Sequence, residues 1–263
     1  MAERLSMQDE TLLESHGDHL QRYKFASTYC VDKRVLDAGC GIGYGSHFLW
    51  KHGAEHVTAV DISQEAIDEA RKSFDANGIS FLQGDLGELP DAVKRLAFGT
   101  IVHFENLEHL TAPDRFLDRV PELLEPGGTF ITSTPNGELS LRDDAGRLCN
   151  PFHVHEYTRD ELLQLLSPRF SEVQFFGQWL TYDGRLRQLE NRRRFDHMTD
   201  IYFNPMMRVG RAILRLAGRP VSSPPIFRGE GLSYDGDYAI RPLDQHVYPW
   251  PPTTLVALCR VKA

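Results

Sequence analysis

Cysteine is scarce and scattered in this chain of 263 residues. The four cysteines, Cys30, Cys40, Cys149 and Cys259, form no CxxC pair, and no Cys/His cluster has the spacing of a zinc finger. We therefore expect no disulfide framework, and we expect reduced thiols in a cytoplasmic protein.

Long apolar runs and an excess of positive charge are also missing. No stretch approaches the roughly 18 to 20 apolar residues that span a bilayer, and the first residues lack the pattern of a signal peptide. The chain has 29 Lys and Arg against 37 Asp and Glu, a net charge of -8. Such a chain has little charge for neutralising phosphates, so we do not expect it to bind nucleic acid.

Short apolar segments alternate with helical patterns in the first half of the chain. Each apolar segment is hydrophobic throughout, which is typical of a parallel sheet covered on both faces. Right-handed crossovers then predict a doubly wound α/β fold, in which ligands bind beyond the carboxyl ends of the strands. The expected strands are 34–37, 56–61, 79–83, 100–104 and 129–133, and the expected helices are 12–29, 46–52, 63–77 and 113–124.

The pattern changes after Pro135. A polar loop leads to a helix that begins at Thr158, with Glu161 completing a capping box. Strands are expected at 172–180 and 253–261, and the more than 70 residues between them show no strand alternation. The predicted organisation is N-terminal cap helices over 1–32, a core domain over 33–181 and 253–263, and an insertion over 182–252 that serves as a lid, substrate or oligomer surface.

The first strand ends in a D-x-G-x-G-x-G motif over residues 37–43, where a helix begins. Glycines there let the backbone approach a ligand, and the start of a helix favours an anion. A nicotinamide site needs G-x-G-x-x-G, but its third glycine would fall on Tyr44 or Ser46. Asp37 would repel a pyrophosphate and suits a cationic ligand, while a tight turn without a ligand is the alternative.

The segment VLDAGCGIGYG at 35–45 resembles the first motif of class I S-adenosylmethionine-dependent methyltransferases. The resemblance continues through FENLEH at 104–109 and LEPGG at 124–128. It implies a Rossmann-like, seven-stranded, mostly parallel sheet that ends in an antiparallel hairpin, here with a helical lid insertion. It also implies that residues 33–181 and 253–263 bind S-adenosylmethionine as the cofactor.

The resemblance assigns the cofactor site residue by residue. Asp61 matches the acid that receives the ribose hydroxyls, and residues 85–86 match the segment that flanks the adenine. HLQRYKF at 19–25 resembles a helix that covers the cofactor pocket in members that modify sugars, and a plain capping helix is the alternative. The expected cofactor-binding residues are Tyr23, Asp37, Gly39, Gly41, Gly43, Asp61, Ile62, Asp85, Leu86, Phe104 and Glu105.

Methyl transfer needs an aligned acceptor and, for a hydroxyl, a base. NPFHVHE at 150–156 resembles the NPFHxxE of bacterial enzymes that methylate sugar hydroxyls, mycobacterial polysaccharide enzymes among them. The resemblance makes His153 the base and Glu156 its positioning partner, and imidazole has a suitable pKa. His109 with Glu108 is a second candidate. In the alternative readings, the histidines of the loop cap the next helix and anchor the loop, and His109 packs against the cofactor pocket or forms a hydrogen bond with a loop carbonyl.

A divalent metal is not favoured. A magnesium site could draw on His153, His155, Asp143 and Asp144, but Mg²⁺ prefers oxygen ligands to imidazole, so no metal ligand is assigned.

Residues 185–219 carry nine arginines against three acids, and apolar residues recur at helical spacing over 206–219. A basic amphipathic helix favours contact with a membrane surface or an anionic substrate. A lid or homodimer helix with a solvated basic face is the alternative.

The sequence thus predicts an S-adenosylmethionine-dependent O-methyltransferase that acts on a sugar or glycan, in polysaccharide biosynthesis, by in-line displacement with a histidine base. One alternative is an O- or N-methyltransferase of a small natural product or lipid-like acceptor. Another is a non-catalytic cofactor-binding subunit, which the intact glycine turn argues against. Aromatic residues that could line an apolar acceptor pocket are Trp179, Tyr182, Phe195, Tyr202 and Phe203.

Overall fold

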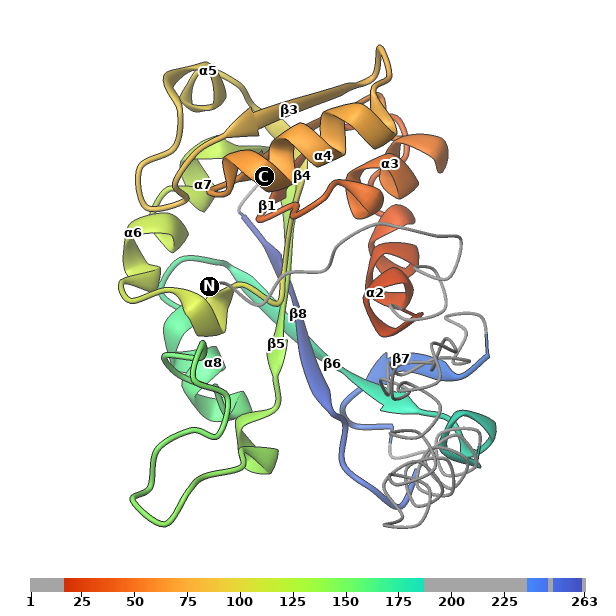
Figure 1. Cartoon of the computed structure of the whole chain (residues 1–263), viewed down its shortest axis with the longest axis vertical. Helices are drawn as coiled ribbons and strands as arrows, with labels where there is room; N and C mark the ends of the chain where they lie inside the picture. The colour runs from red at the N-terminus through yellow and green to blue at the C-terminus, as the bar shows by residue number, and fades with distance from the viewer. Residues whose placement is uncertain (1–16, 187–235, 246–247, 262–263) are drawn as a thin grey trace, which may run out of the picture.

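The computed structural model describes residues 17–186, 236–245 and 248–261 (Figure 1). These residues form one mixed eight-stranded sheet in the order β3-β2-β1-β4-β5-β8-β6-β7. The strands are β1 (Arg34–Ala38), β2 (His56–Asp61), β3 (Ile79–Gln83), β4 (Phe98–Phe104), β5 (Leu124–Pro135), β6 (Glu172–Leu180), β7 (Tyr238–Pro242) and β8 (Thr254–Arg260).

Helices cover both faces of the sheet, as the uniformly apolar strands predict. Figure 1 shows α2, α3 and α4 on one face and α6, α7 and α8 on the other, and each set packs on its own apolar core. The helices are α2 (Gly17–Ser27), α3 (Tyr44–Lys51), α4 (Gln64–Phe74), α5 (Asp91–Lys94), α6 (Pro113–Leu117), α7 (Val120–Leu123) and α8 (Arg159–Leu166), with 3₁₀ turns η1 (Leu107–His109) and η2 (Gly137–Leu139).

Helix starts follow the local sequence closely. The Ser63 hydroxyl caps α4 by accepting a hydrogen bond from the Ala66 amide at 3.2 Å. Thr158 and Glu161 form the predicted capping box of α8, with each side chain accepting from the other's backbone amide. Both caps satisfy amides that have no partner inside the first turn of the helix.

The predicted single helix over 113–124 is wrong, because the segment folds as two short helices, α6 and α7. Pro121 lies at the start of α7, where a residue without an N–H is tolerated but cannot continue a preceding helix. Leu124 already belongs to β5, so this strand begins five residues before the predicted one.

The prediction of seven strands, with no strand between 181 and 252, is also wrong. β7 pairs antiparallel with β6 at the edge of the sheet, with Gly177 opposite Arg241. Its side chains do not alternate between buried and exposed, so the sequence gives no period-two signal. The predicted basic helix 206–219, together with Phe195, Tyr202 and Phe203, lies outside the described residues.

The sheet register gathers the predicted site residues at one edge. Asp37 on β1 lies opposite Ala59 on β2 and Val102 on β4, so the loops that follow these three strands leave the sheet side by side. None of the described helices is both long enough and apolar enough to cross a membrane.

Candidate active site

The glycine turn after β1 has a left-handed backbone. Gly39, Gly41 and Gly43 have φ values of 85°, 53° and 84°, a region that residues with a side chain rarely adopt. The amides of Gly39 and Cys40 both donate to the Val60 carbonyl, at 2.7 and 3.0 Å, which fastens the turn to β2. A methyl group on Gly41 would meet no protein atom within 4 Å, so a ligand can approach the backbone there.

Asp37 lies buried beneath this turn and accepts hydrogen bonds from two helices. Ser46 on α3 donates to Oδ2 at 2.6 Å, and Tyr23 on α2 donates to Oδ1 at 3.2 Å. Burial raises the pKa of the Asp37 carboxyl to about 7, although the Ser46 and Tyr23 hydrogen bonds act in the opposite direction. A positively charged ligand group would favour the ionised form.

Asp61 ends β2 and accepts backbone hydrogen bonds on both oxygens. The Gly41 amide donates to Oδ2 and the Ser63 amide to Oδ1, each at 2.9 Å. A carboxylate has about four lone-pair positions, so both oxygens keep acceptor capacity for ligand hydroxyls. The side chain of Ile62, next to Asp61, is 66% exposed and offers an apolar surface.

The loop after β3 contributes less than the sequence suggests. Asp85 is exposed, and its Oδ1 accepts a hydrogen bond from the Gly87 amide at 2.7 Å. Leu86 is buried in the apolar core on the α5–α8 face of the sheet.

The end of β4 connects the glycine turn to the N-terminal helix. The Phe104 ring packs edge-on against Tyr23, with centroids 5.1 Å apart. Glu105 has a left-handed φ of 50°, and its Oε1 accepts from the Ser133 hydroxyl at 2.8 Å. Asn106 donates to the Gly39 carbonyl at 3.2 Å. Asn106 is not among the expected site residues, although it lies in the FENLEH motif.

Arg22 is the residue that sequence reasoning missed most clearly. Its side chain is fully buried, and Nη1 donates to Oε1 of Gln178 on β6 at 2.5 Å. Nη2 lies 3.5 Å from Oδ2 of Asp18, but neither Nε nor Nη2 has a hydrogen-bond partner among the described residues. Burial lowers the pKa of the guanidinium, and nearby Glu105 and Asp18 more than offset this, so it stays charged. The sequence signal was its position in the HLQRYKF segment.

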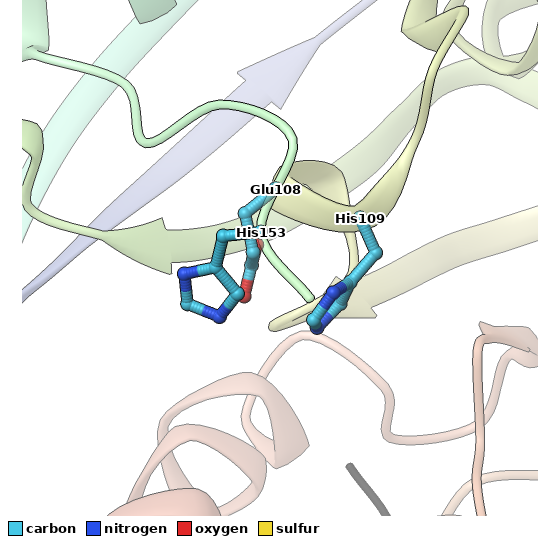
Figure 2. A group of neighbouring side chains, drawn as sticks. All are labelled: Glu108, His109 and His153. Carbon is cyan, nitrogen blue, oxygen red and sulfur yellow. The ribbon is translucent and has the colours of Figure 1, made fainter. Parts of the chain in front are cut away.

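The loop over 150–157 docks on η1. The amides of Val154 and His155 both donate to the backbone carbonyl of Glu108, at 2.7 and 3.3 Å. This docking brings the His109 and His153 rings into edge-on contact with centroids 5.0 Å apart. Figure 2 shows both rings and the Glu108 carboxylate gathered together. The two candidate bases of the sequence therefore belong to one site.

The imidazole of His153 is held on both nitrogens. Nδ1 lies 2.6 Å from Oε1 of Glu156, and Nε2 lies 2.9 Å from the side-chain amide nitrogen of Asn150. In this assignment of the amide, Asn150 donates, so Nε2 is the acceptor and Nδ1 carries the proton that it donates to Glu156. Burial raises the pKa of Glu156, but hydrogen bonds from Ser140 and His153 outweigh burial and lower the pKa overall.

His109 and Glu108 complete this group. Nδ1 of His109 lies 2.9 Å from the Phe152 carbonyl, which can only accept, so Nδ1 is the protonated nitrogen. The side chain of Glu108 is buried, with 1% of the residue exposed, and Oε2 has no hydrogen-bond partner among the residues described. Burial, reinforced by the charge of Glu105, holds the pKa of Glu108 well above its usual range.

A polar pocket of about 570 Å³ opens beside His153. It combines acceptors, donors and charges of both signs, and much of its lining comes from the loop that precedes α8. The lining residues are Arg142, Asp143, Arg147, Leu148, Asn150, Pro151, His153, Val154 and His155.

The metal-ligand set considered from the sequence is not the one that the fold brings together. Asp143 is occupied by Arg147, at 2.9 Å from Nε, and His155 lies 3.4 Å from Oε1 of Glu161. Within the described ranges, one group has donor atoms within 4.8 Å of one another, and it consists of Glu108, His109 and His153.

Comparison with known families identifies the chain. The model of the Methyltransferase domain family matches residues 31–179, more than half of the chain. The protein belongs to this family. The matched segment runs from just before β1 to the end of β6, so it includes the glycine turn, Asp61 and the group around His153.

Similar curated proteins are methyltransferases. The chain is 31% identical over 175 residues to a probable S-adenosylmethionine-dependent methyltransferase of Mycobacterium tuberculosis H37Rv, covering 66% of this chain and 61% of that protein. It is 38% identical over 113 residues to the ubiquinone biosynthesis O-methyltransferase of Xylella fastidiosa, covering 41% and 44%. It is 31% identical over 125 residues to the fatty-acid O-methyltransferase of Mycolicibacterium smegmatis, covering 44% and 45%. The matches span less than two thirds of each relative's length.

Solved structures share the fold. An S-adenosylmethionine-dependent methyltransferase from Mesorhizobium loti superposes with a TM-score of 0.55 at 17% identity, covering 93% of this chain and 99% of that one. The N-methyltransferase NodS of Bradyrhizobium japonicum, solved with S-adenosylhomocysteine, superposes with a TM-score of 0.51 at 20% identity, covering 63% and 79%.

The predicted fold class, methyltransferase family and cofactor are thus confirmed, and the cofactor is S-adenosylmethionine. The residues at the carboxyl edge of the sheet fit it chemically. A buried carboxylate suits its ammonium, a second carboxylate suits its ribose hydroxyls, and an open glycine backbone allows close approach. When bound, its sulfonium supplies an electrophilic methyl group.

Proposed function

We propose that this protein transfers a methyl group from S-adenosylmethionine to a hydroxyl of a sugar or glycan. The observation that carries this proposal is the polar pocket that opens on His153, whose ring is oriented by Glu156. A pocket lined by arginine, aspartate, asparagine and histidine supplies donors and acceptors for several hydroxyls. An apolar acceptor would cover these charged and polar groups without adding hydrogen bonds to them.

In this proposal the cofactor is held by groups at the ends of β1, β2 and β4. Asp37 faces the ammonium and Asp61 accepts from the ribose hydroxyls. Ile62 covers the adenine with its exposed side chain, and residues 85–86 flank it. Arg22 receives the methionine carboxylate on Nε and Nη2, since guanidinium groups bind carboxylates in a two-pronged geometry.

The acceptor hydroxyl attacks the sulfonium methyl in line, and the proton leaves toward His153. The new bond joins the acceptor oxygen to the methyl carbon, while the bond from sulfur to that carbon breaks and releases S-adenosylhomocysteine. Nε2 of His153 accepts the hydroxyl proton, because Nδ1 already carries a proton donated to Glu156. The Glu156 carboxylate stabilises the imidazolium that forms, in the manner of other carboxylate–histidine pairs.

His153→Ala tests this assignment. We expect the variant to lose at least about a hundredfold in turnover, the range typical of general-base removal, with unchanged affinity for S-adenosylhomocysteine. Turnover is measured as S-adenosylhomocysteine release with a panel of saccharide acceptors, and the product is confirmed by mass spectrometry as the addition of one methyl group. His52→Ala, at the exposed end of α3, is the matched control. Wild-type turnover in His153→Ala would exclude the histidine base, and no methylated saccharide from the wild type would exclude the acceptor class.

A second candidate is methyl transfer to a lipid-like acceptor. The matches to a ubiquinone biosynthesis and a fatty-acid O-methyltransferase favour it. Within the described residues, Tyr182, Tyr248 and Trp250 form an aromatic cluster, with Tyr182 56% exposed. Trp179, proposed for an apolar pocket, is buried instead and donates to the Trp250 carbonyl. Adding long-chain fatty acids and phenolic lipids to the acceptor panel separates the two candidates.

A further inference from the structure

We propose that Glu108, His109 and His153 together bind one divalent ion of a first-row transition metal. The binding does not depend on which acceptor is methylated, and only its effect on the acceptor rests on the proposed function. It replaces the imidazole base of that function, because Nε2 of His153 cannot hold an ion and accept a proton at once. The site lies where the loop over 150–157 docks on η1, beside the polar pocket.

The donor atoms are already close to one another. One nitrogen from each histidine and one carboxylate oxygen of Glu108 lie within 4.8 Å of one another, and Figure 2 shows the three side chains gathered together. Ligands that hold a zinc-like ion at about 2.1 Å lie roughly 3 to 3.5 Å apart. Closing this difference requires rotations of the three side chains.

Both imidazoles are oriented as metal ligands usually are. Nδ1 of His153 is held by the Glu156 carboxylate at 2.6 Å, and Nδ1 of His109 by the Phe152 carbonyl at 2.9 Å. A metal-binding histidine nearly always donates its other ring N–H to a carboxylate or a backbone carbonyl, which fixes the tautomer. In both residues this leaves Nε2 with its lone pair for coordination. At His153, the ion replaces the contact that Nε2 makes with the Asn150 amide.

Glu108 supplies the independent indication of a ligand. Its carboxylate is almost completely buried, yet Oε2 makes no well-formed hydrogen bond among the described residues, although the Thr134 hydroxyl lies close enough to lower the pKa of Glu108. Buried polar atoms without a partner are rare, since each costs about 1–3 kcal/mol. A cation bound at Oε2 removes this cost.

The donor set selects the class of ion. Two imidazole nitrogens and one carboxylate oxygen suit Mn²⁺, Fe²⁺, Co²⁺ or Zn²⁺, whereas Mg²⁺ prefers oxygen ligands in an octahedron. Three protein ligands also leave coordination positions open, as in catalytic rather than structural sites.

An ion here would change how the acceptor hydroxyl is activated. Two oxygens of a sugar diol can occupy the open positions, and the ion lowers the pKa of the hydroxyl bound to it. That proton passes to solvent water, the oxygen attacks the methyl carbon, and the bond from sulfur to carbon breaks. Nε2 of His153 then serves as a ligand, so the ion takes over the task assigned to the imidazole base.

Cobalt binding to the full chain tests the site directly. Protein stripped with a chelator is titrated with Co²⁺ alone, and visible absorption reports nitrogen and oxygen coordination. We expect one Co²⁺ per chain. Glu108→Gln and His109→Ala should each weaken Co²⁺ binding by at least about tenfold, since even the loss of a residue that only orients a metal ligand lowers metal affinity about 10- to 100-fold. Glu156→Gln should weaken it within that range. His155→Ala, in the same loop but paired with Glu161, should bind Co²⁺ like the wild type.

Affinity for S-adenosylhomocysteine checks that each variant is folded. If Glu108→Gln does not fold, His109→Ala at the partly exposed histidine serves as the test variant. Absence of stoichiometric Co²⁺ binding, or unchanged binding in His109→Ala, would overturn the site. Methyl transfer is followed separately with and without chelator. Transfer to a saccharide without Co²⁺ binding leaves the proposed function standing and removes the metal. Co²⁺ binding without transfer to any saccharide supports the metal site and removes the proposed acceptor class.

Discussion

The Tyr23 hydroxyl donates a hydrogen bond to the buried Asp37 carboxylate, at 3.2 Å, and joins the N-terminal helix to the strand that carries the glycine turn. The Tyr23 ring also packs edge-on against Phe104 at the end of β4. In the cofactor site that we propose, helix α2 therefore contributes both Tyr23 and the buried guanidinium of Arg22. This relationship leads to three predictions about cofactor binding.

Cofactor affinity should rise with pH through about 7. Burial raises the pKa of Asp37 to about 7, so the carboxyl is mostly neutral below that pH and mostly ionised above it. Only the ionised form attracts the cofactor's ammonium, and at one pH unit below the pKa about a tenth of the groups are ionised. We expect S-adenosylhomocysteine to bind about tenfold more weakly at about pH 6 than at about pH 8, measured by calorimetry.

Asp37→Asn is the control for this pH dependence. The amide cannot ionise, so the variant should bind weakly at both pH values, with a flat profile between them. The same slope in the variant as in the wild type would assign the pH dependence to another group.

Alanine substitutions at Gly41 and Gly45 should have different effects. A methyl group on Gly45 would lie 2.0 Å from the Tyr23 ring, whereas one on Gly41 would meet no protein atom within 4 Å. We expect Gly45→Ala to displace α2 and lower the free energy of unfolding markedly. Gly41→Ala pays only the left-handed strain, about 1–2 kcal/mol, but should lose cofactor affinity because the methyl group occupies the approach to the backbone. Urea unfolding and calorimetry separate the two effects, and wild-type affinity in Gly41→Ala would argue against contact there.

Replacing Arg22 should affect only ligands that carry a carboxylate. Arg22→Met keeps the volume but leaves the buried Gln178 Oε1 without its donor, so we also expect a loss of about 1–3 kcal/mol in the free energy of unfolding. We expect affinity for S-adenosylhomocysteine to fall about 10- to 100-fold, the equivalent of a charged hydrogen bond of about 1.5–3 kcal/mol. Binding of 5′-methylthioadenosine, which lacks the amino acid part, is the control and should not change. Equal losses for both ligands would show that Arg22 acts on the fold of the pocket instead.

Short-range features of this protein could be predicted from the chain alone. The glycine turn, the β2 strand with Asp61 at its end and the Ser63 cap of α4 depend on neighbouring residues, whose backbone preferences and apolar runs are visible in the sequence. The class of fold could be predicted because uniformly apolar strands that alternate with helices have few stable arrangements. Even so, Pro121 split a helix that periodicity alone would continue.

Long-range packing decided the rest. β7 is a strand because β6 offers it hydrogen bonds, and its own residues show no alternation. Arg22 can be a buried cation because Oε1 of Gln178, 156 residues away in the chain, accepts a hydrogen bond from its guanidinium. His109 and His153 form one site because two amides of the 150–157 loop bind the Glu108 carbonyl. Such contacts join groups that are distant in the chain, so local preferences do not encode them, and only the folded sheet brings the partners within hydrogen-bond distance.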